Sequence, residues 1–311
     1  MDKVSKSKAL LAAGLLAGFV AAPASAAVLF SDDMSSGAAW TVNALSADDT
    51  ATFGYDYGTL AGIPAAPTAG SDTIGLRLAS NTVDGTEGGV TVTATGQSFS
   101  GIYTLSYDVW VQWDAATGGS TENVGGGVGY DGTTIQGDLG TGSGGHLLMV
   151  GDGSSSRDYR MYKDAGEQFI ASGQYNPAIL TNTNDDPLLQ AISPSVDIST
   201  FDPPQTGATG FSGDGVPGFN WTHVDMIVNE GAGTIRIELD GLWLGTLDTN
   251  IGSPVPLSGA ISLFHYDRYG SVAGQWAAAY FDNIVVTDLP EPASLGLLAI
   301  GGIALLRRRV R

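Results

Sequence analysis

The side chains of this chain that could carry out chemistry are aspartates, glutamates, three histidines and aromatic residues, because the sequence has no cysteine. The absence of cysteine excludes disulfide frameworks, thiol catalysis and thiolate metal sites. A serine esterase would require the pattern Gly-x-Ser-x-Gly, and no serine of the chain fits it. His146, His223 and His265 are far apart and lack the spacing of metal ligands. These patterns predict a protein that is not an enzyme.

Two polar strand faces could bind sugar. Residues 103–113 and 221–229 alternate between apolar and polar side chains, which predicts half-buried strands. An exposed tryptophan beside polar groups can stack on a pyranose ring, although most aromatic residues of β-sandwiches lie in the core. If the two strands are neighbours, their polar faces form one surface. The candidate glycan-binding residues are Asp108, Trp110, Gln112, His223 and Asp225.

Calcium is the cofactor that the composition favours, because aspartates are frequent in the expected loops and calcium prefers oxygen ligands. Asp32 or Asp33, near the first strand, and Asp282, in the last strand, form the candidate site. The alternative is that Asp282 only accepts hydrogen bonds from loop amides. Residues 126–131 match one copy of the Gly-Gly-x-Gly-x-Asp calcium repeat. Such repeats work only when stacked, so a turn is expected there.

The elements that must position these side chains are antiparallel strands, because the chain shows no long helical periodicity. Asp240-Gly241 is a strong hairpin signal between two alternating segments. Residues 114–214 are rich in Gly, Ser, Thr, Asn and Asp, which predicts long loops with short strands. We therefore expect one all-β domain over residues 27–289, an antiparallel β-sandwich or jelly roll. The predicted strands are 103–113, 145–150, 159–163, 221–229, 235–239, 261–266 and 279–287.

The N-terminal segment reads as a secretory signal peptide over residues 1–26. Lys3, Lys6 and Lys8 form its positive region, and an apolar stretch follows them. Ala24 and Ala26 frame an Ala-x-Ala cleavage site. We expect export through the Sec translocon and cleavage by signal peptidase after Ala26.

The C-terminal segment, residues 290–311, has three parts in order. Pro290-Glu291-Pro292 comes first. Its prolines are expected to end the last strand and to keep the backbone extended. Residues 293–306 form an apolar run, which as a helix would span about 21 Å, less than the roughly 30 Å hydrocarbon core of a bilayer. Arg307, Arg308 and Arg309 follow, and such a cluster stays on the cytoplasmic side. Both ends of the chain are thus expected to be hydrophobic helices.

This tripartite tail resembles the PEP-CTERM sorting signal. The resemblance covers residues 290–311 and implies processing by an exosortase in a Gram-negative bacterium that makes exopolysaccharide. It implies passage through the inner membrane to the cell surface or the extracellular matrix of a biofilm. The alternative is an ordinary tail anchor that follows two prolines.

A second resemblance lies within residues 221–287. Trp221-Thr-His-Val, the hairpin ending at Asp240-Gly241 and the last strand are similar to laminin-G-like, concanavalin-A-like domains. Enzymes of that fold resembling glycoside hydrolase family 16 carry Glu-x-Asp-x-x-Glu on one strand. Here Trp243 takes the place of the second glutamate after Glu238 and Asp240. Because glycoside hydrolysis needs two carboxylates, this departure favours a protein that does not cleave glycans.

The charge of the chain excludes a further class. The formal net charge is −19, and seven of the 13 basic residues lie in the two terminal segments. An acidic central region repels phosphate backbones, so nucleic-acid binding is not expected. The sequence predicts an exported, non-catalytic surface protein that binds or packs with exopolysaccharide. The alternatives are a structural or adhesive protein without glycan affinity, and an unusual glycan-active enzyme.

Overall fold

The alternating segments of the sequence form strands. Five of the seven predicted segments correspond to β6 (Ile102–Gln112), β11 (Trp221–Asn229), β12 (Thr234–Leu239), β14 (Ala260–Asp267) and β15 (Ala278–Asp288), and the segment 103–113 runs one residue past the end of β6. Alternation places successive side chains on opposite faces of a strand. In β11, for example, every second residue is buried and the others are partly exposed. The predicted strand positions are confirmed.

The computed structural model of this chain describes residues 26–83, 85–113, 122–138, 140–151, 156–200, 211–269 and 278–289. The cleavage-site residue Ala24 and the sorting residues Pro290–Pro292 and Arg307–Arg309 lie outside these ranges, as do both expected terminal helices. Residues Ala26–Leu289 belong to one unit by their internal contacts.

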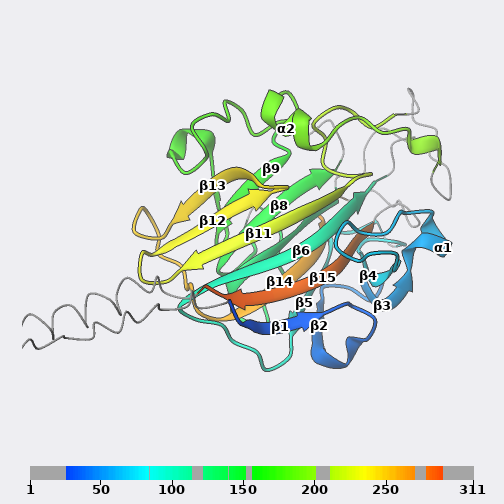
Figure 1. Ribbon diagram of the computed structural model, residues 1–311, viewed down its shortest axis with the longest axis horizontal. Coiled ribbons are helices and arrows are strands. Elements are labelled where there is room, and N and C mark those ends of the chain that lie inside the picture. The colour runs from blue at the N-terminus through cyan, green and yellow to red at the C-terminus, as the bar shows by residue number, and fades with distance from the viewer. Residues whose placement is uncertain are drawn as a thin grey trace, which may run out of the picture. The chain divides into compact units, whose positions relative to one another are not determined.

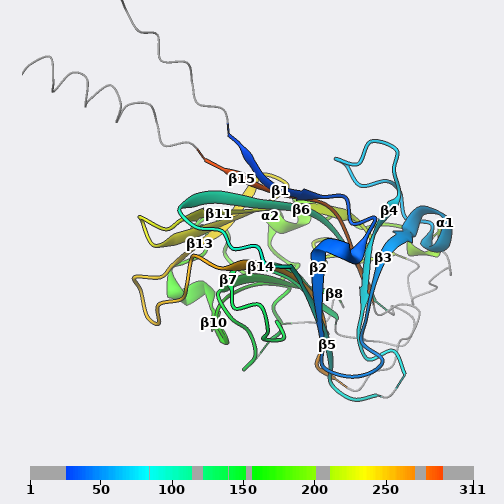
Figure 2. The same cartoon turned by 90° about the horizontal axis from the view of Figure 1, so that it is seen from below.

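The described strands form two antiparallel sheets that pack face to face (Figures 1 and 2). Sheet A has the order β13-β12-β11-β6-β15-β4-β3, with β1 also paired to β15. Sheet B has the order β10-β9-β8-β7-β14-β5-β2. The predicted all-β sandwich is therefore confirmed. The remaining strands are β1 (Val28–Asp32), β2 (Trp40–Ala44), β3 (Thr50–Asp56), β4 (Ile74–Ala79), β5 (Gly88–Ala94), β7 (Glu122–Tyr130), β8 (Gly145–Gly151), β9 (Tyr159–Lys163), β10 (Gly166–Gln168) and β13 (Leu242–Asp248).

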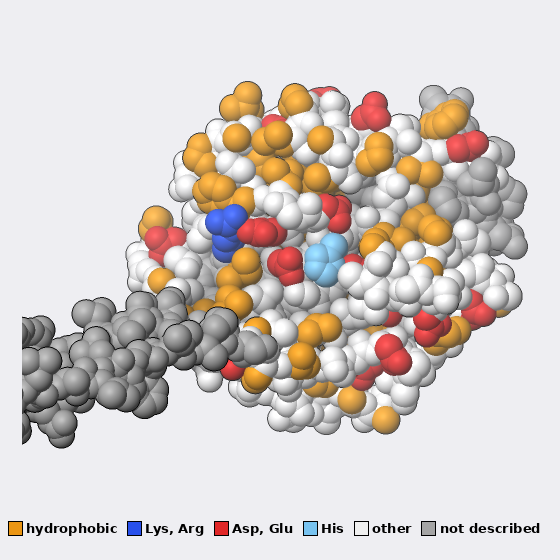
Figure 3. Space-filling model, in the orientation of Figure 1, with side chains coloured by type: hydrophobic (Ala, Val, Ile, Leu, Met, Phe, Trp, Pro, Cys, Tyr) orange, Lys and Arg blue, Asp and Glu red, His pale blue; other side chains and the backbone are white. Residues whose placement is uncertain are grey.

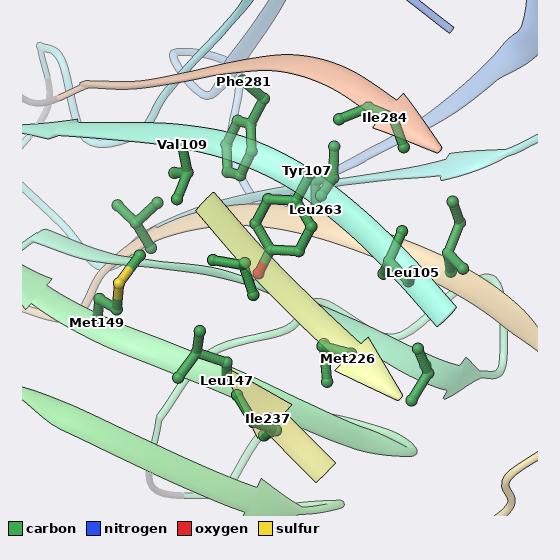
Figure 4. Packing of buried hydrophobic residues seen from close by; sticks show 14 of the residues in the cluster. Leu105, Tyr107, Val109, Leu147, Met149, Met226, Ile237, Leu263, Phe281 and Ile284 are labelled. Carbon is green, nitrogen blue, oxygen red and sulfur yellow. The ribbon is translucent and has the colours of Figure 1, made fainter. Parts of the chain in front are cut away.

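The hydrophobic core lies between the two sheets (Figure 4). Leu105 and Tyr107 of β6 and Leu147 and Met149 of β8 belong to this core, and all four side chains are fully buried. Burying one such side chain contributes roughly 1.5–3 kcal/mol. The apolar face of each strand thus fixes which face of β6 and β11 points outward.

A turn was expected from the sequence at the glycine-rich segment 126–131. This expectation was wrong, because residues up to Tyr130 belong to β7. Gly126 faces the core, where a Cβ atom would lie 2.8 Å from the ring of Tyr107. A side chain at this position would overlap the aromatic ring. Here glycine allows close packing of the two sheets. Asp131 accepts hydrogen bonds from the backbone amides of Thr133 and Thr134.

Two backbone irregularities shape the outer face of sheet A, the face that points away from sheet B. Asp240 and Gly241 both have positive φ angles, 49° and 79°, and close the predicted two-residue hairpin between β12 and β13. In β15 one extra residue lies between the partners of Asp108 and Ser106, where Asn283 has a φ angle of 54°. This β-bulge brings Asp282 directly opposite Asp108.

In the part of the chain that the structure describes, two short α-helices lie between strands, α1 (Tyr57–Ala61) and α2 (Pro187–Ile192). The side chain of Asp56 caps α1 by accepting a hydrogen bond from the amide of Thr59, at 2.9 Å. The loop after α1 reaches the outer face of sheet A, where the carbonyl of Pro64 accepts a hydrogen bond from Trp221 Nε1. In the described ranges no helix is long and apolar enough to cross a membrane.

Candidate functional site

Charged side chains from three strands meet on the outer face of sheet A. β6 pairs with both β11 and β15, and the register places His223 and Asp282 opposite Asp108 on either side. Directly opposed residues on one sheet face have Cβ atoms about 4.5–5.5 Å apart. The strands that carry Asp108 and His223 are therefore neighbours, as a shared polar surface requires.

Asp108 and His223 form the centre of this site. His223 Nδ1 lies 2.7 Å from Asp108 Oδ1, and the Asp108 side chain is fully buried. The second oxygen of Asp108 accepts hydrogen bonds from the hydroxyl of Thr68 and from Asn283 Nδ2. Burial alone would raise the pKa of Asp108, but the hydrogen bonds from His223 and Thr68 outweigh it and lower the pKa. Asp108 is thus a buried carboxylate with three donors.

His223 is held between two carboxylates. Its Nε2 atom lies 3.6 Å from Asp225 Oδ1, which also accepts a hydrogen bond of 2.5 Å from the Ser106 hydroxyl. The hydrogen bond to Asp108 is the main reason that the pKa of His223 rises to about 10, and the nearby carboxylate of Asp225 adds to the rise. His223 is consequently an imidazolium at neutral pH. Its side chain remains 31% exposed, so solvent and ligands can reach it.

Asp282 occupies a different environment on the same face. It accepts hydrogen bonds from the Tyr57 hydroxyl at 2.8 Å and from the backbone amide of Asn283 at 2.7 Å. Burial raises its pKa to about 6, and the charge of nearby Asp108 adds to the rise. Asp108 and Asp282 are thus two neighbouring carboxylates of which one is far more readily protonated.

The structure does not gather the candidate calcium ligands into one site. Asp32 and Asp33 accept hydrogen bonds from the amides of Met34 and Ser35, at 2.7 and 3.0 Å. Both line a surface pocket of about 450 Å³ beside β15, and Asp282 is not among its lining residues. Among the described residues, no three carboxylate or histidine side chains are placed to share a metal ion. Calcium binding stays a prediction.

The charged site continues across β12 to the edge strand β13. Asp225 is opposite Glu238, and Glu238 is opposite Trp243. Arg236 Nε lies 2.5 Å from Glu238 Oε1, and its guanidinium lies 5.1 Å from the centre of the Trp243 ring. We call the set Asp108, His223, Asp225, Glu238, Arg236 and Trp243 the polar row. Figure 3 shows a histidine side chain close to acidic and basic side chains on the face turned toward the viewer.

Part of the polar row was not predicted from the sequence. Arg236 and Glu238 belong to the alternating segment before the Asp240-Gly241 turn, so their outward orientation could have been inferred. Thr68 and Asn283 could not have been found in this way. They depend on a loop that crosses the sheet and on the β-bulge in β15.

Trp110 and Gln112 are not accessible, contrary to expectation. Trp110 is 2% exposed and packs edge-on against Trp221, with ring centres 5.8 Å apart. Gln112 is 1% exposed and accepts a hydrogen bond from the Tyr280 hydroxyl at 3.1 Å. Both belong to the outer face of sheet A, and there Trp110 packs in a buried cluster with residues from α1 and from the segment before β11. The prediction that Trp110 is exposed and stacks on a sugar ring is therefore wrong.

The other two histidines are buried. His146 stacks on Tyr162 at 4.8 Å between ring centres, and burial lowers its pKa to about 4. His265 lies within 3.0 Å of both Ser80 Oγ and Glu122 Oε2, and all three residues are fully buried. Neither histidine faces solvent, so His223 is the one of the three histidines that a ligand can reach.

Several solved structures are similar to this chain. One is a protein of unknown function with galectin-like fold from Bacillus subtilis, at 12% identity and a TM-score of 0.47, which covers 86% of this chain and 100% of that chain. Another is the Emp47p carbohydrate recognition domain, at 9% identity and a TM-score of 0.43, over 85% and 96% of the two chains. A third is the endo-β-1,4-glucuronan lyase from the fungus Trichoderma reesei, at 10% identity and a TM-score of 0.44, over 85% and 96%. With TM-scores this low, the sandwich architecture rests on the strand pairing itself.

The remaining comparisons concern sequence. No curated protein matches the chain. Residues 288–310 match the family described as "PEP-CTERM protein-sorting motif". The predicted resemblance of the tail is thus confirmed, and the motif implies an exosortase as processing partner. The chain ends in a PEP-CTERM sorting motif, which implies a surface protein exported through the membrane of a Gram-negative bacterium.

Proposed function

We propose that this chain is a surface protein whose sandwich domain binds exopolysaccharide on the outer face of sheet A, without cleaving it. The observation that carries the proposal is the polar row. It combines a half-buried tryptophan ring with charged groups of both signs on four adjacent strands. Groups on paired strands keep fixed spacings, which suits recognition of a repeating ligand.

The chemistry of the polar row fits a polyhydroxylated ligand. Carboxylates accept hydrogen bonds from hydroxyl groups, and charge-assisted bonds are stronger than neutral ones. Asp225 and Glu238 are partly exposed, at 28% and 19% of their side chains, so they can accept from sugar hydroxyls. Trp243 supplies an aromatic surface at the edge of the sheet. The exported location of the protein supports a ligand outside the cell.

The same geometry supports a non-catalytic role. Glycoside hydrolysis uses one carboxyl group with a raised pKa as an acid and a second carboxylate as base or nucleophile. Asp282 has the raised pKa, but it is 2% exposed and accepts hydrogen bonds from Tyr57 and Asn283. Asp108 is fully buried beneath His223. Asp282 and Asp108, the two carboxyl groups that could act together in hydrolysis, are thus shielded from a large substrate.

The test is binding of exopolysaccharide from the producing bacterium to the chain Ala27–Arg311 in mild detergent, measured by calorimetry. We expect binding, and an affinity about ten-fold weaker for Trp243→Ala and for Asp225→Asn, since tenfold corresponds to about 1.4 kcal/mol. New reducing ends in the mixture would contradict the non-catalytic part of the proposal. Absence of binding by the unaltered chain would contradict the whole.

Phe169→Ala is the matched control. The Phe169 ring is 49% exposed and lies under the guanidinium of Arg157 at 5.0 Å, as Trp243 lies under Arg236. Phe169 follows β10 of sheet B and is not part of the polar row. This variant is expected to bind like the unaltered chain. Equal losses for Phe169→Ala and Trp243→Ala would show that the outer face of sheet A is not the binding surface.

A further inference from the structure

The first strand of the sandwich, β1, lies beside the last strand, β15, so that the start of β1 meets the end of β15. β1 and β15 pair antiparallel, with Val28 opposite Thr287. Beyond this pair the amide of Asp288 donates to the carbonyl of Ala27 at 2.9 Å. In return the backbone nitrogen of Ala27 donates to Asp288 Oδ1 at 2.5 Å. Figure 2 shows β1 and β15 side by side.

Asp288 has no cationic partner within the part of the chain that the structure describes. None of the ion pairs there includes it, and its carboxylate accepts from the neutral amide of Ala27. The nearest strand partner of Asp288 on the other side is Tyr103 of β6. Glu230, the acidic residue near this end of β6, accepts a hydrogen bond from the amide of Gly101 at 2.6 Å. The surroundings of Asp288 therefore favour a cation.

Cleavage of the signal peptide after Ala26 would change the chemistry of the backbone nitrogen of Ala27. Water adds across the Ala26–Ala27 peptide bond, which leaves a carboxylate on Ala26 and an amine on Ala27. An α-amino group has an ordinary pKa of about 8, so it takes up a proton at neutral pH. The amide that already touches Asp288 becomes an ammonium group at the same position.

We propose that removal of the signal peptide creates an ion pair between the Ala27 ammonium and Asp288, which stabilises the pairing of β1 with β15. The pair forms only at the N-terminus that cleavage after Ala26 produces. Asp288 is the first residue of the matched sorting motif, and Pro290 follows two positions later. Processing at one end of the chain thus stabilises the strand from which the sorting motif at the other end extends.

The test compares two forms of the chain that ends at Arg311, in mild detergent. One begins at Ala27, and the other carries Gly-Ser-Gly before Ala27, which moves the ammonium away from Asp288. At pH 7 we expect the amides at the C-terminal end of β15 to exchange about two- to five-fold more slowly in the first form, as an exposed ion pair allows. Equal exchange in both forms would overturn the proposal.

The dependence on pH has a defined sign. An ammonium that gains a carboxylate partner has a raised pKa in the folded state, so its contribution is complete below about pH 8 and is lost as pH rises further. The difference between the two forms should therefore vanish near pH 10.5. A difference that persists there would arise from the added residues and would overturn the proposal.

Two variants separate the ion pair from a general effect of the added residues. Asp288→Asn keeps the shape of the side chain and removes its charge, so the two forms should exchange equally. Asp185→Asn alters an exposed aspartate far along the chain and should leave the difference intact. An undiminished difference in Asp288→Asn would rule out the proposed pair.

Discussion

At the residue scale, the polar row depends on one histidine that stays charged on an open sheet face. His223 is only partly buried, yet its Nδ1 atom contacts the fully buried carboxylate of Asp108. A buried charge needs a partner, because burial without one is costly. The imidazolium of His223 therefore holds the site together as well as lining it.

Replacing His223 by glutamine should lower the free energy of unfolding at pH 7 by about 1.5–3 kcal/mol, the usual contribution of a hydrogen bond to a charged group. The pKa of His223 is about 10 in the folded protein and 6.5 ordinarily. A group with a raised folded pKa stabilises fully below its unfolded pKa and loses this effect as pH rises through the folded value. The free energies of unfolding of the two proteins, measured with urea, should therefore become more similar as the pH rises from 6.5 to about 10.5.

Arg236→Gln is the control for this experiment. Arg236 pairs with Glu238 on the same face, but its side chain is 49% exposed. Exposed ion pairs contribute at most about 1 kcal/mol, and arginine does not lose its proton in this range. An equal loss of stability in both variants, or a loss in His223→Gln that is the same at all pH values, would refute the role of the imidazolium.

The residues of the site were predicted only in part, for a physical reason. Alternation assigns a side chain to one face of its strand, and this assignment was correct for Asp108, His223 and Asp225. It does not reveal what covers that face. Trp110 is buried because α1 and the segment before β11 pack over its end of the sheet. That covering depends on contacts between distant parts of the chain.

At the element scale, the seven segments predicted from the sequence are strands, but others, such as β3, β4, β5 and the glycine-rich β7, were not predicted. Glycine has low β-propensity, so β7 lacks the signal of a strand. Its neighbours explain its composition, because Gly126 lies against Tyr107 of the opposite sheet. The bulge in β15, which brings Asp282 opposite Asp108, likewise leaves no pattern in the sequence.

Gly126→Ala should destabilise the sandwich, since the new methyl group would lie 2.8 Å from the Tyr107 ring. Overpacking of a core typically costs about 1–3 kcal/mol. For a domain of this size, the melting temperature should fall by roughly 2–4 °C per kcal/mol. Differential scanning calorimetry measures the change.

Gly231→Ala provides the comparison. A Cβ at Gly231, in the turn between β11 and β12, would have its nearest contact at 3.6 Å, which is an ordinary van der Waals distance. Its melting temperature should stay within about 2 °C of the unaltered protein. If Gly126→Ala behaved in the same way, β7 would not pack against Tyr107 as described.

At the scale of the whole molecule, the chain has a sandwich domain, a C-terminal sorting motif and an N-terminal segment that is predicted to be a signal peptide. The first 26 residues have the pattern of a signal peptide, and residues 288–310 match the PEP-CTERM motif. Seven of the 13 basic residues lie in these end segments. Removing both ends would leave an acidic domain, which suits solubility outside the cell.

Mass spectrometry of the mature protein, purified from the bacterium that makes it, tests this organisation most directly. The account predicts an N-terminus at Ala27 and a C-terminus that lacks the arginines from Arg307 onward. A mature chain that still begins at Met1 or still ends at Arg311 would contradict it.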